Sequence, residues 1–323
     1  DGMRATDAYL TPMSGVASDQ AGGAFFVVSD AVFRVFANAS LYRVAGSLLR
    51  SGLTGDGGPA RDALLSGVVD VAYDAVSGSL FVSELSSCGI RRVHANGTIT
   101  RFAGGTNSFR CSVGMTGDGG QALGATFTTP YGLTVDRYNN SLLVAVRNAH
   151  AVCRIDLATG IITRYFGTYG LSGSSDGGGH ALLATVNTPA DVSAGPTAIF
   201  VSAEGGLSIR RIDRASGVVT THLAVGLGAP RGVAAGPGGV VLACDTTGGV
   251  SLITGPGTRR IIADSTGTTT DAATFANASR INQPAFADHD ASTGRYVFTE
   301  SAGALREYDD VRGVLRTIGS SAV

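Results

Sequence analysis

The stretch DVAYDAVSGSLFVSE, residues 70–84, contains the pattern that decides the fold of this chain. A short strand of small and apolar residues leads into a turn rich in Asp, Ser and Gly, and a second β-rich strand follows and ends in an acid. The pattern recurs five more times, at residues 15–30, 132–146, 191–203, 232–245 and 286–300. Self-similarity at this spacing predicts a repeat architecture.

Each copy is followed by a third and a fourth strand. IRRV from Ile90 is a third strand and TITRFAGG from Thr98 is a fourth, and the other third strands begin at Phe33, Val152, Ile209, Val250 and Leu305. Four short strands per repeat of roughly 40–60 residues are typical of propeller blades, and no helical periodicity competes with this pattern. We therefore predict a single all-β domain, a six-bladed β-propeller of four-stranded antiparallel blades. The blades lie near residues 1–50, 51–109, 110–170, 171–225, 226–265 and 266–323, and GVLRTIG at 313–319 completes the last one.

The composition fits this fold and narrows the range of partners. Hydrophobic residues make up 44% of the 323-residue chain, charged residues 15%, and 47 residues are glycine, as many short strands and tight turns require. The net charge of −1 gives no field to attract nucleic acid or anionic membranes, so we expect neither as a partner. No stretch approaches the roughly 18 apolar residues that span a bilayer. We expect a monomer that meets a membrane only through segments outside this chain.

A second motif occupies three of the connections between blades. It reads TGDGGPARDALL at 54–65, TGDGGQALGATF at 116–127 and SSDGGGHALLAT at 174–185, with a worn copy, TTTDAATFA, near Phe275. With this motif, the chain resembles the NHL-repeat family over essentially its whole length, and the resemblance implies the six-bladed fold. The family's Asn-His pair is mostly absent. A phosphate-binding loop would need a lysine, which the chain lacks, so we interpret the loops as structural, with their alanines and leucine packed between blades.

Four Asn-x-Ser/Thr sequons point to one face of the predicted disc. In a propeller, the turns from first to second and from third to fourth strand share one face, here the turn face. The remaining loops and the blade-to-blade connections share the opposite, long-loop face. Asn38, Asn96 and Asn139 fall in turns, whereas Asn277 falls in a blade-to-blade connection. Attached glycans would therefore shield the turn face and leave the long-loop face open.

The four cysteines bear on the compartment. Cys88 and Cys111 both project from the long-loop face of the second blade, so we predict a disulfide between them and an oxidising environment. Cys153 and Cys244 lie in different blades, and we expect two separate buried thiols.

Acidic residues recur where the central channel would open. Asp30, Glu84, Asp245 and Glu300 end second strands, where we expect them to accept hydrogen bonds from loop backbone. Asp70 and Asp191 stand at the starts of innermost strands where other blades carry glycine. Asp70, Glu84 and Asp191 are the candidate metal ligands, since calcium prefers several oxygen ligands.

Histidine and arginine give weaker signals. His150 and His180 both belong to the long-loop face of the third blade, but two histidines make an incomplete zinc site. Arginines gather on the third strands of the second to fourth blades, where we expect a solvated edge and not an RNA-binding face: Arg91, Arg92, Arg154, Arg210 and Arg211.

Two functions remain open. The leading hypothesis is a non-catalytic recognition module, the ectodomain of a secreted or cell-surface protein. It would bind a protein or glycan through the long-loop face around Asp56, Asp118 and Asp176, with His150 and His180 nearby, and would need no cofactor. The alternative is a divalent-metal-dependent hydrolase or lyase with its site at the channel mouth and calcium in the channel. An RNA-binding role is the third and most remote option.

Overall fold

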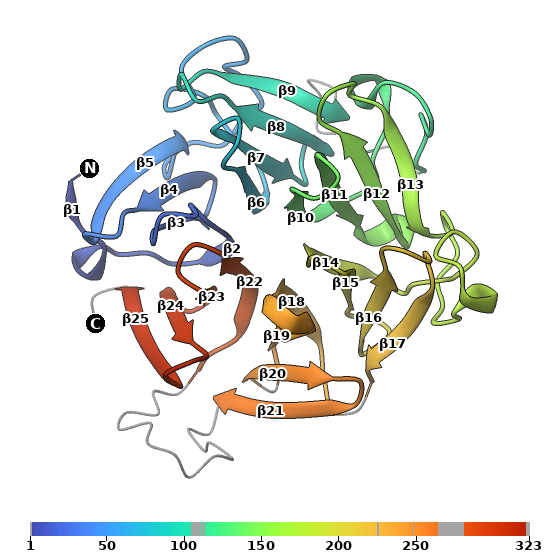
Figure 1. Ribbon diagram of the computed structural model, residues 1–323. Coiled ribbons are helices and arrows are strands. Elements are labelled where there is room, and N and C mark those ends of the chain that lie inside the picture. The colour runs from blue at the N-terminus through green and yellow to red at the C-terminus, as the bar shows by residue number, and fades with distance from the viewer. Residues whose placement is uncertain are drawn as a thin grey trace.

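The computed structural model describes residues 2–104, 111, 114–224, 226–247, 249–263 and 281–320. Six antiparallel sheets surround one axis, each made of strands that follow one another in sequence (Figure 1). The predicted all-β, six-bladed β-propeller is therefore confirmed.

Every blade presents its first strand to the centre and its fourth to the rim (Figure 1). The innermost strands are β2 (Met13–Ser18), β6 (Val68–Asp74), β10 (Pro130–Asp136), β14 (Pro189–Ala194), β18 (Pro230–Ala235) and β22 (Pro284–Asp290). The second strands are β3 (Ala24–Val28), β7 (Ser79–Glu84), β11 (Ser141–Val146), β15 (Ala198–Ala203), β19 (Val241–Asp245) and β23 (Arg295–Glu300). The third strands are β4 (Ala31–Val35), β8 (Gly89–Val93), β12 (Ala151–Asp156), β16 (Ser208–Asp213), β20 (Gly249–Gly255) and β24 (Ala304–Asp309). The fourth strands counted outward are β5 (Ser40–Gly46), β9 (Ile99–Gly104), β13 (Ile162–Gly167), β17 (Val219–Leu223), β21 (Thr258–Ala263) and β25 (Val314–Ser320).

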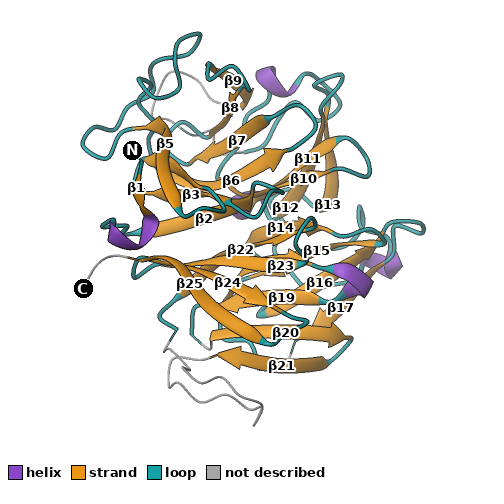
Figure 2. Cartoon of the chain, turned by 60° about the vertical axis from the view of Figure 1, so that its left-hand side comes forward, coloured by secondary structure: helices purple, strands orange, loops and turns teal. Residues whose placement is uncertain are grey.

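Helical structure in the described residues is limited to single 3-10 turns between strands (Figure 2). They are η1 (Ala5–Asp7), η2 (Ala122–Gly124), η3 (Arg147–Ala149), η4 (Gly177–Gly179) and η5 (Pro237–Gly239). None of these turns has the length and apolar character that a membrane crossing requires.

The core lies between the blades. The described residues form six hydrophobic clusters, one at each interface between neighbouring blades. Second strands are covered on both faces, so β11, with the sequence SLLVAV, is buried at all six positions instead of alternating. The turn after β8 reverses through Gly97 at φ 83°, a conformation that favours glycine.

The ring closes between the sixth and first blades, and none of the described strands is shared between these two sheets. The backbone N–H of Ser18 donates to Oδ2 of Asp288 at 2.8 Å, and Nε2 of Gln20 donates to the carbonyl of His289 at 3.2 Å. The two-residue strand β1 (Met3–Arg4) pairs with β5 and extends the first blade to five strands.

Candidate functional site

At one equivalent position of the innermost strands, small and large residues alternate from blade to blade around the axis. Blades 1, 3 and 5 carry a glycine at this level, whereas blades 2, 4 and 6 carry Asp70, Asp191 and Phe286, all buried. A Cβ on Gly15 would lie 2.3 Å from Oδ1 of Asp70, and one on Gly132 would lie 2.5 Å from Oδ1 of Asp191. The Asp70 and Asp191 side chains therefore occupy the space that the glycine of the preceding blade leaves open, whereas a Cβ on Gly232 would meet the backbone of Ala285, Phe286 and Ala287.

The two aspartates tie their own blade to the next one. Oδ2 of Asp70 accepts from the backbone N–H of Leu133 at 2.8 Å, and Oδ2 of Asp191 accepts from that of Val233 at 2.9 Å. Burial raises the pKa of both carboxyl groups well above the usual range, and repulsion between the acids of the innermost strands adds to the effect for each.

Glu84 has its own partners. Its Oε1 accepts from the backbone N–H of Ser66 at 3.0 Å. Burial raises the pKa of Glu84 to about 7, against the opposing effect of the Arg91 charge. Within the described part of the chain, no three His, Cys, Asp or Glu side chains are grouped so as to hold a metal ion. The predicted set of Asp70, Glu84 and Asp191 stays a prediction.

The other acids that end second strands also bind loop backbone. Oδ1 of Asp30 accepts from Gly67 N–H at 2.7 Å, Oδ1 of Asp245 from Ala229 N–H at 3.0 Å, and Oε2 of Glu300 from Asn282 N–H at 2.8 Å. This is the expected structural use of these acids.

A charged cluster lies on the long-loop face at the channel mouth. Nη2 of Arg147 lies 2.5 Å from Oε2 of Glu204, and Nη2 of Arg231 lies 3.7 Å from Oε1 of the same carboxylate. The Arg147 guanidinium lies 5.3 Å from the ring centroid of Tyr131, and this ring is 5.8 Å from that of Phe286. We call Tyr131, Arg147, Glu204 and Arg231 the mouth cluster. Its two guanidinium groups and one carboxylate leave one excess positive charge.

The sequence patterns did not single out the mouth cluster. Burial raises the pKa of the Tyr131 hydroxyl, although the charges of Arg231 and Arg147 oppose this. Arg147 and Glu204 occupy the loop positions after second strands, and Tyr131 and Arg231 precede the glycines of the third and fifth blades. These positions within the repeat are the signal in the sequence by which the mouth cluster could have been found.

A second polar site lies on the turn face at the other end of the axis. A cavity of about 120 Å³ is lined by residues of all six blades, among them Asp288, His289 and Arg137. Burial raises the pKa of Asp288 to about 6, and the charge of Arg137 opposes this rise. No sequence pattern pointed to this group either.

The DGG connections run along the outer edge of the disc. Gly57 N–H donates to the carbonyl of Ile99 in β9, and Ile99 N–H donates back to Gly58, at 2.8 and 3.0 Å. Gly119 and Gly120 repeat this exchange with Ile162 of β13. The alanines of the motif are buried, as expected for packing between blades: Ala60, Ala63, Ala122, Ala125, Ala181 and Ala184.

Two of the three DGG aspartates bind a buried arginine. Asp56 pairs with Arg91 at 2.8 Å, and Asp176 pairs with Arg210. Arg91 is 5% exposed and Arg210 1% exposed, so the expectation of a solvated arginine edge is wrong for both. These guanidinium groups lie beneath the DGG connections. They donate there to backbone carbonyls and to the aspartate instead of to water. In the third blade, Cys153 takes the arginine position, and Asp118 accepts from Arg164 N–H at 2.6 Å.

The two candidate histidines have separate partners. Nδ1 of His150 accepts from Thr188 N–H at 3.1 Å, and Nδ1 of His180 accepts from Leu182 N–H at 3.2 Å. His180 pairs as a β-bridge with Val218 beside the outermost strand of blade 4. Ligand contact by these histidines and by Asp56, Asp118 and Asp176 stays a prediction.

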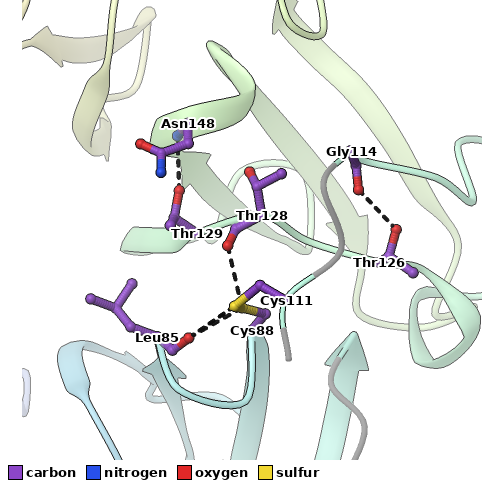
Figure 3. Close-up of a disulfide and its surroundings, with 8 residues drawn as sticks. All are labelled: Leu85, Cys88, Cys111, Gly114, Thr126, Thr128, Thr129 and Asn148. Atoms are coloured by element: carbon purple, nitrogen blue, oxygen red, sulfur yellow. Dashed lines mark hydrogen bonds between the residues drawn. A yellow bond between two sulfur atoms is a disulfide. The ribbon is translucent and has the colours of Figure 1, made fainter. Parts of the chain in front are cut away.

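The predicted disulfide is confirmed between Cys88 and Cys111, with the Cα atoms 5.4 Å apart. Figure 3 shows the bridge beside Leu85 and Thr128, whose carbonyl oxygens lie 3.1 and 3.2 Å from the Cys88 sulfur. It joins the loop after β7 to the connection that leaves the same blade. Cys153 and Cys244 are buried free thiols, as expected.

Three of the four sequons can be placed. Asn38, Asn96 and Asn139 are exposed in turns of the turn face, whereas Asn277 lies outside the described residues. Nδ2 of Asn139 donates to the carboxylate of Asp136 at 3.2 Å.

The chain is similar in fold to solved six-bladed β-propellers. The propeller of the nidogen/laminin complex matches with a TM-score of 0.62 and 10% identity, over 91% of this chain and 92% of that one. A gluconolactonase from Xanthomonas campestris matches with a TM-score of 0.60 and 14% identity, over 90% and 84%. Virginiamycin B lyase from Staphylococcus aureus matches with 0.55 and 16%, over 97% and 86%. No family model and no curated protein matches the chain.

At these identities the matches define the class of fold, a six-bladed β-propeller. The class includes both enzymes and a protein solved in complex with laminin, so the fold alone leaves the function undecided.

Proposed function

We propose that this chain is a non-catalytic recognition module, built from NHL-type repeats and belonging to a secreted or cell-surface protein. It binds a protein or glycan that presents an acidic group to the long-loop face. The observation that carries the proposal is the mouth cluster, in which Arg147 and Arg231 converge on the single carboxylate of Glu204.

The chemistry of the mouth cluster suits recognition of an anion. Guanidinium groups bind carboxylate, sulfate or phosphate through paired N–H donors, and the Tyr131 ring offers an apolar surface beside them. Three different blades supply the charged groups, so the rigid ring holds them in place. The Cys88–Cys111 disulfide favours an oxidising compartment, which agrees with an extracellular setting.

The test is binding to immobilised acidic oligosaccharides and acidic peptides, with neutral ones of equal length as controls. The proposal expects salt-sensitive binding of acidic probes that falls at least tenfold in Arg231→Gln. Arg312→Gln, which removes the same charge from an exposed turn-face position, should bind as the wild type does. Equal binding of acidic and neutral probes would contradict the proposal.

The perturbed carboxyl groups favour one other candidate, a divalent-metal-dependent hydrolase or lyase. Strongly shifted carboxyl groups are typical of functional sites, and Asp70, Glu84 and Asp191 all have raised pKa values. Metal analysis, with thermal melts in calcium and in chelator, tests it. A stoichiometric ion that disappears in the double variant Asp70→Asn, Asp191→Asn would support the enzyme, and no ion with no shift would argue against it.

A further inference from the structure

A large groove on the turn face lies between blades 1 and 2, away from the channel. Its volume is about 560 Å³, within the range of roughly 300–1,000 Å³ that small-molecule sites usually have. Outer strands of blade 1 form one wall, and the turn of residues 94–97 in blade 2 forms part of the other.

The groove is lined mainly by aromatic and aliphatic side chains. Phe25, Phe36, Tyr42 and Tyr73 contribute rings, and Tyr42 is 41% exposed. The Arg34 guanidinium lies 4.2 Å from the ring centroid of Phe36 and pairs with Asp19 at 2.8 Å. The groove therefore offers an aromatic surface. The charge of the neighbouring Arg34 is already balanced by Asp19.

Asn96, the asparagine of the NGT sequon, lies on the edge of this groove and is exposed. Its Oδ1 accepts from the backbone N–H of Thr98 at 3.0 Å and from the Thr98 hydroxyl at 2.7 Å. These bonds hold the carbonyl end of the side-chain amide. The amide nitrogen donates to none of the described residues and is available for attachment.

We propose that this groove holds the protein's own N-linked glycan, with the sugar attached to Asn96 seated against Tyr42 and Phe36. In the attachment, Nδ2 loses a proton and bonds to the anomeric carbon of a sugar diphosphate donor, whose diphosphate departs. The C–H face of a pyranose ring is apolar and matches an aromatic wall, while its hydroxyl groups remain in water. The inference requires a glycan on Asn96, but it is independent of any ligand at the mouth cluster.

Asn38 provides the matched comparison. It is another exposed sequon on the turn face, and its Oδ1 accepts from the backbone N–H and the hydroxyl of Ser40, as Oδ1 of Asn96 does from Thr98. Asn38 is not among the residues that line the groove, so loss of a glycan there should leave the fold unaffected.

The experiment uses the full chain secreted from a glycosylating host, with site occupancy measured by peptide mass. Melting temperature is compared between the secreted wild type and four variants: Asn96→Asp, Asn38→Asp, Tyr42→Ser and the double variant Asn96→Asp, Tyr42→Ser. Asn96→Asp made in bacteria, beside bacterial wild type, gives the effect of the substitution without sugar.

The proposal expects occupied Asn96 and a melting temperature about 2–4 °C lower in secreted Asn96→Asp. The bacterial pair should differ by less than 1 °C, and Asn38→Asp should have no effect. In the Tyr42→Ser background the glycan should stabilise by less than half as much. An unoccupied Asn96, or an Asn96 effect equal in the presence and absence of Tyr42, would overturn the proposal.

Discussion

Oδ2 of Asp70, in the innermost strand of blade 2, accepts a hydrogen bond from the backbone N–H of Leu133 in blade 3, at 2.8 Å. Asp191 repeats this contact with Val233 two blades further on. The glycine of each preceding blade makes room for the aspartate. Alternate blades therefore differ in their innermost strand, and the six repeats act as three pairs around the axis.

Replacement of Gly132 by alanine should destabilise the fold, because the added Cβ would lie 2.5 Å from Oδ1 of Asp191 and 2.6 Å from the carbonyl of Ala190. We expect a loss of about 1–3 kcal/mol in the free energy of unfolding, measured by urea denaturation. Gly124→Ala, where a Cβ meets nothing within 4 Å, is the control. Equal stability of the two variants would contradict this packing.

Stability should fall as the pH rises from about 4.5 to about 7 because of Glu84. The pKa of Glu84 is raised from 4.5 to about 7, so between these values the folded state binds more protons than the unfolded state. The free energy of unfolding then decreases with pH. Asp70 and Asp191 act in the same direction, since their pKa values are also raised.

Glu84→Gln keeps the acceptor for Ser66 but cannot titrate. The difference in unfolding free energy between pH 5 and pH 8 should shrink by about 2.5 kcal/mol in this variant. Chemical denaturation at the two pH values measures it. An unchanged difference would show that Glu84 titrates normally in the folded state.

Arg210→Gln should destabilise far more than Arg211→Gln. The Arg210 side chain is 1% exposed and donates to Asp176 and to the carbonyls of Thr185 and Ser175, so its loss removes all of these hydrogen bonds from a buried guanidinium site. We expect a loss of about 1–3 kcal/mol, whereas the half-buried Arg211 should cost less than 1 kcal/mol. Similar losses of stability at both positions would contradict a special structural role for the buried Arg210 and would favour the solvated arginine edge expected from the sequence.

Loss of the disulfide should destabilise the chain through its unfolded state. Cys88 and Cys111 are 23 residues apart in sequence, and a closed loop of this size contributes about 3 kcal/mol in the chain-entropy account. Paired Cys88→Ser and Cys111→Ser should lower the denaturation midpoint in urea, and reductant should then have no further effect. An unchanged urea denaturation midpoint of the wild type in the presence of reductant would contradict this prediction.

The fold could be predicted because each blade repeats the same strand order, and the sequence signal accumulates over six copies. The Cys88–Cys111 bridge could be predicted from the same repeat positions, since both cysteines lie in loops of the second blade on the long-loop face. These inferences needed only the position of a residue within its repeat.

The mouth cluster could not be predicted in this way, since contacts between blades depend on how neighbouring blades rotate against each other. Arg147 and Arg231 come from blades 3 and 5, and only the assembled ring brings them to Glu204. The burial of Arg91 also depends on a contact between blades and could not be predicted from its place in the repeat. Its third strand suggested solvent exposure, but the connection from the preceding blade folds over it and supplies Asp56.

The measurement that tests the central claim most directly is titration of the secreted protein and its Arg231→Gln variant with one acidic oligosaccharide, at low and at physiological salt. Recognition at the mouth cluster predicts that the oligosaccharide binds and is recovered chemically unchanged, that affinity falls with salt, and that the variant loses at least tenfold. Binding unaffected by the variant, or conversion of the oligosaccharide to product, would contradict a non-catalytic recognition site at Arg147, Glu204 and Arg231.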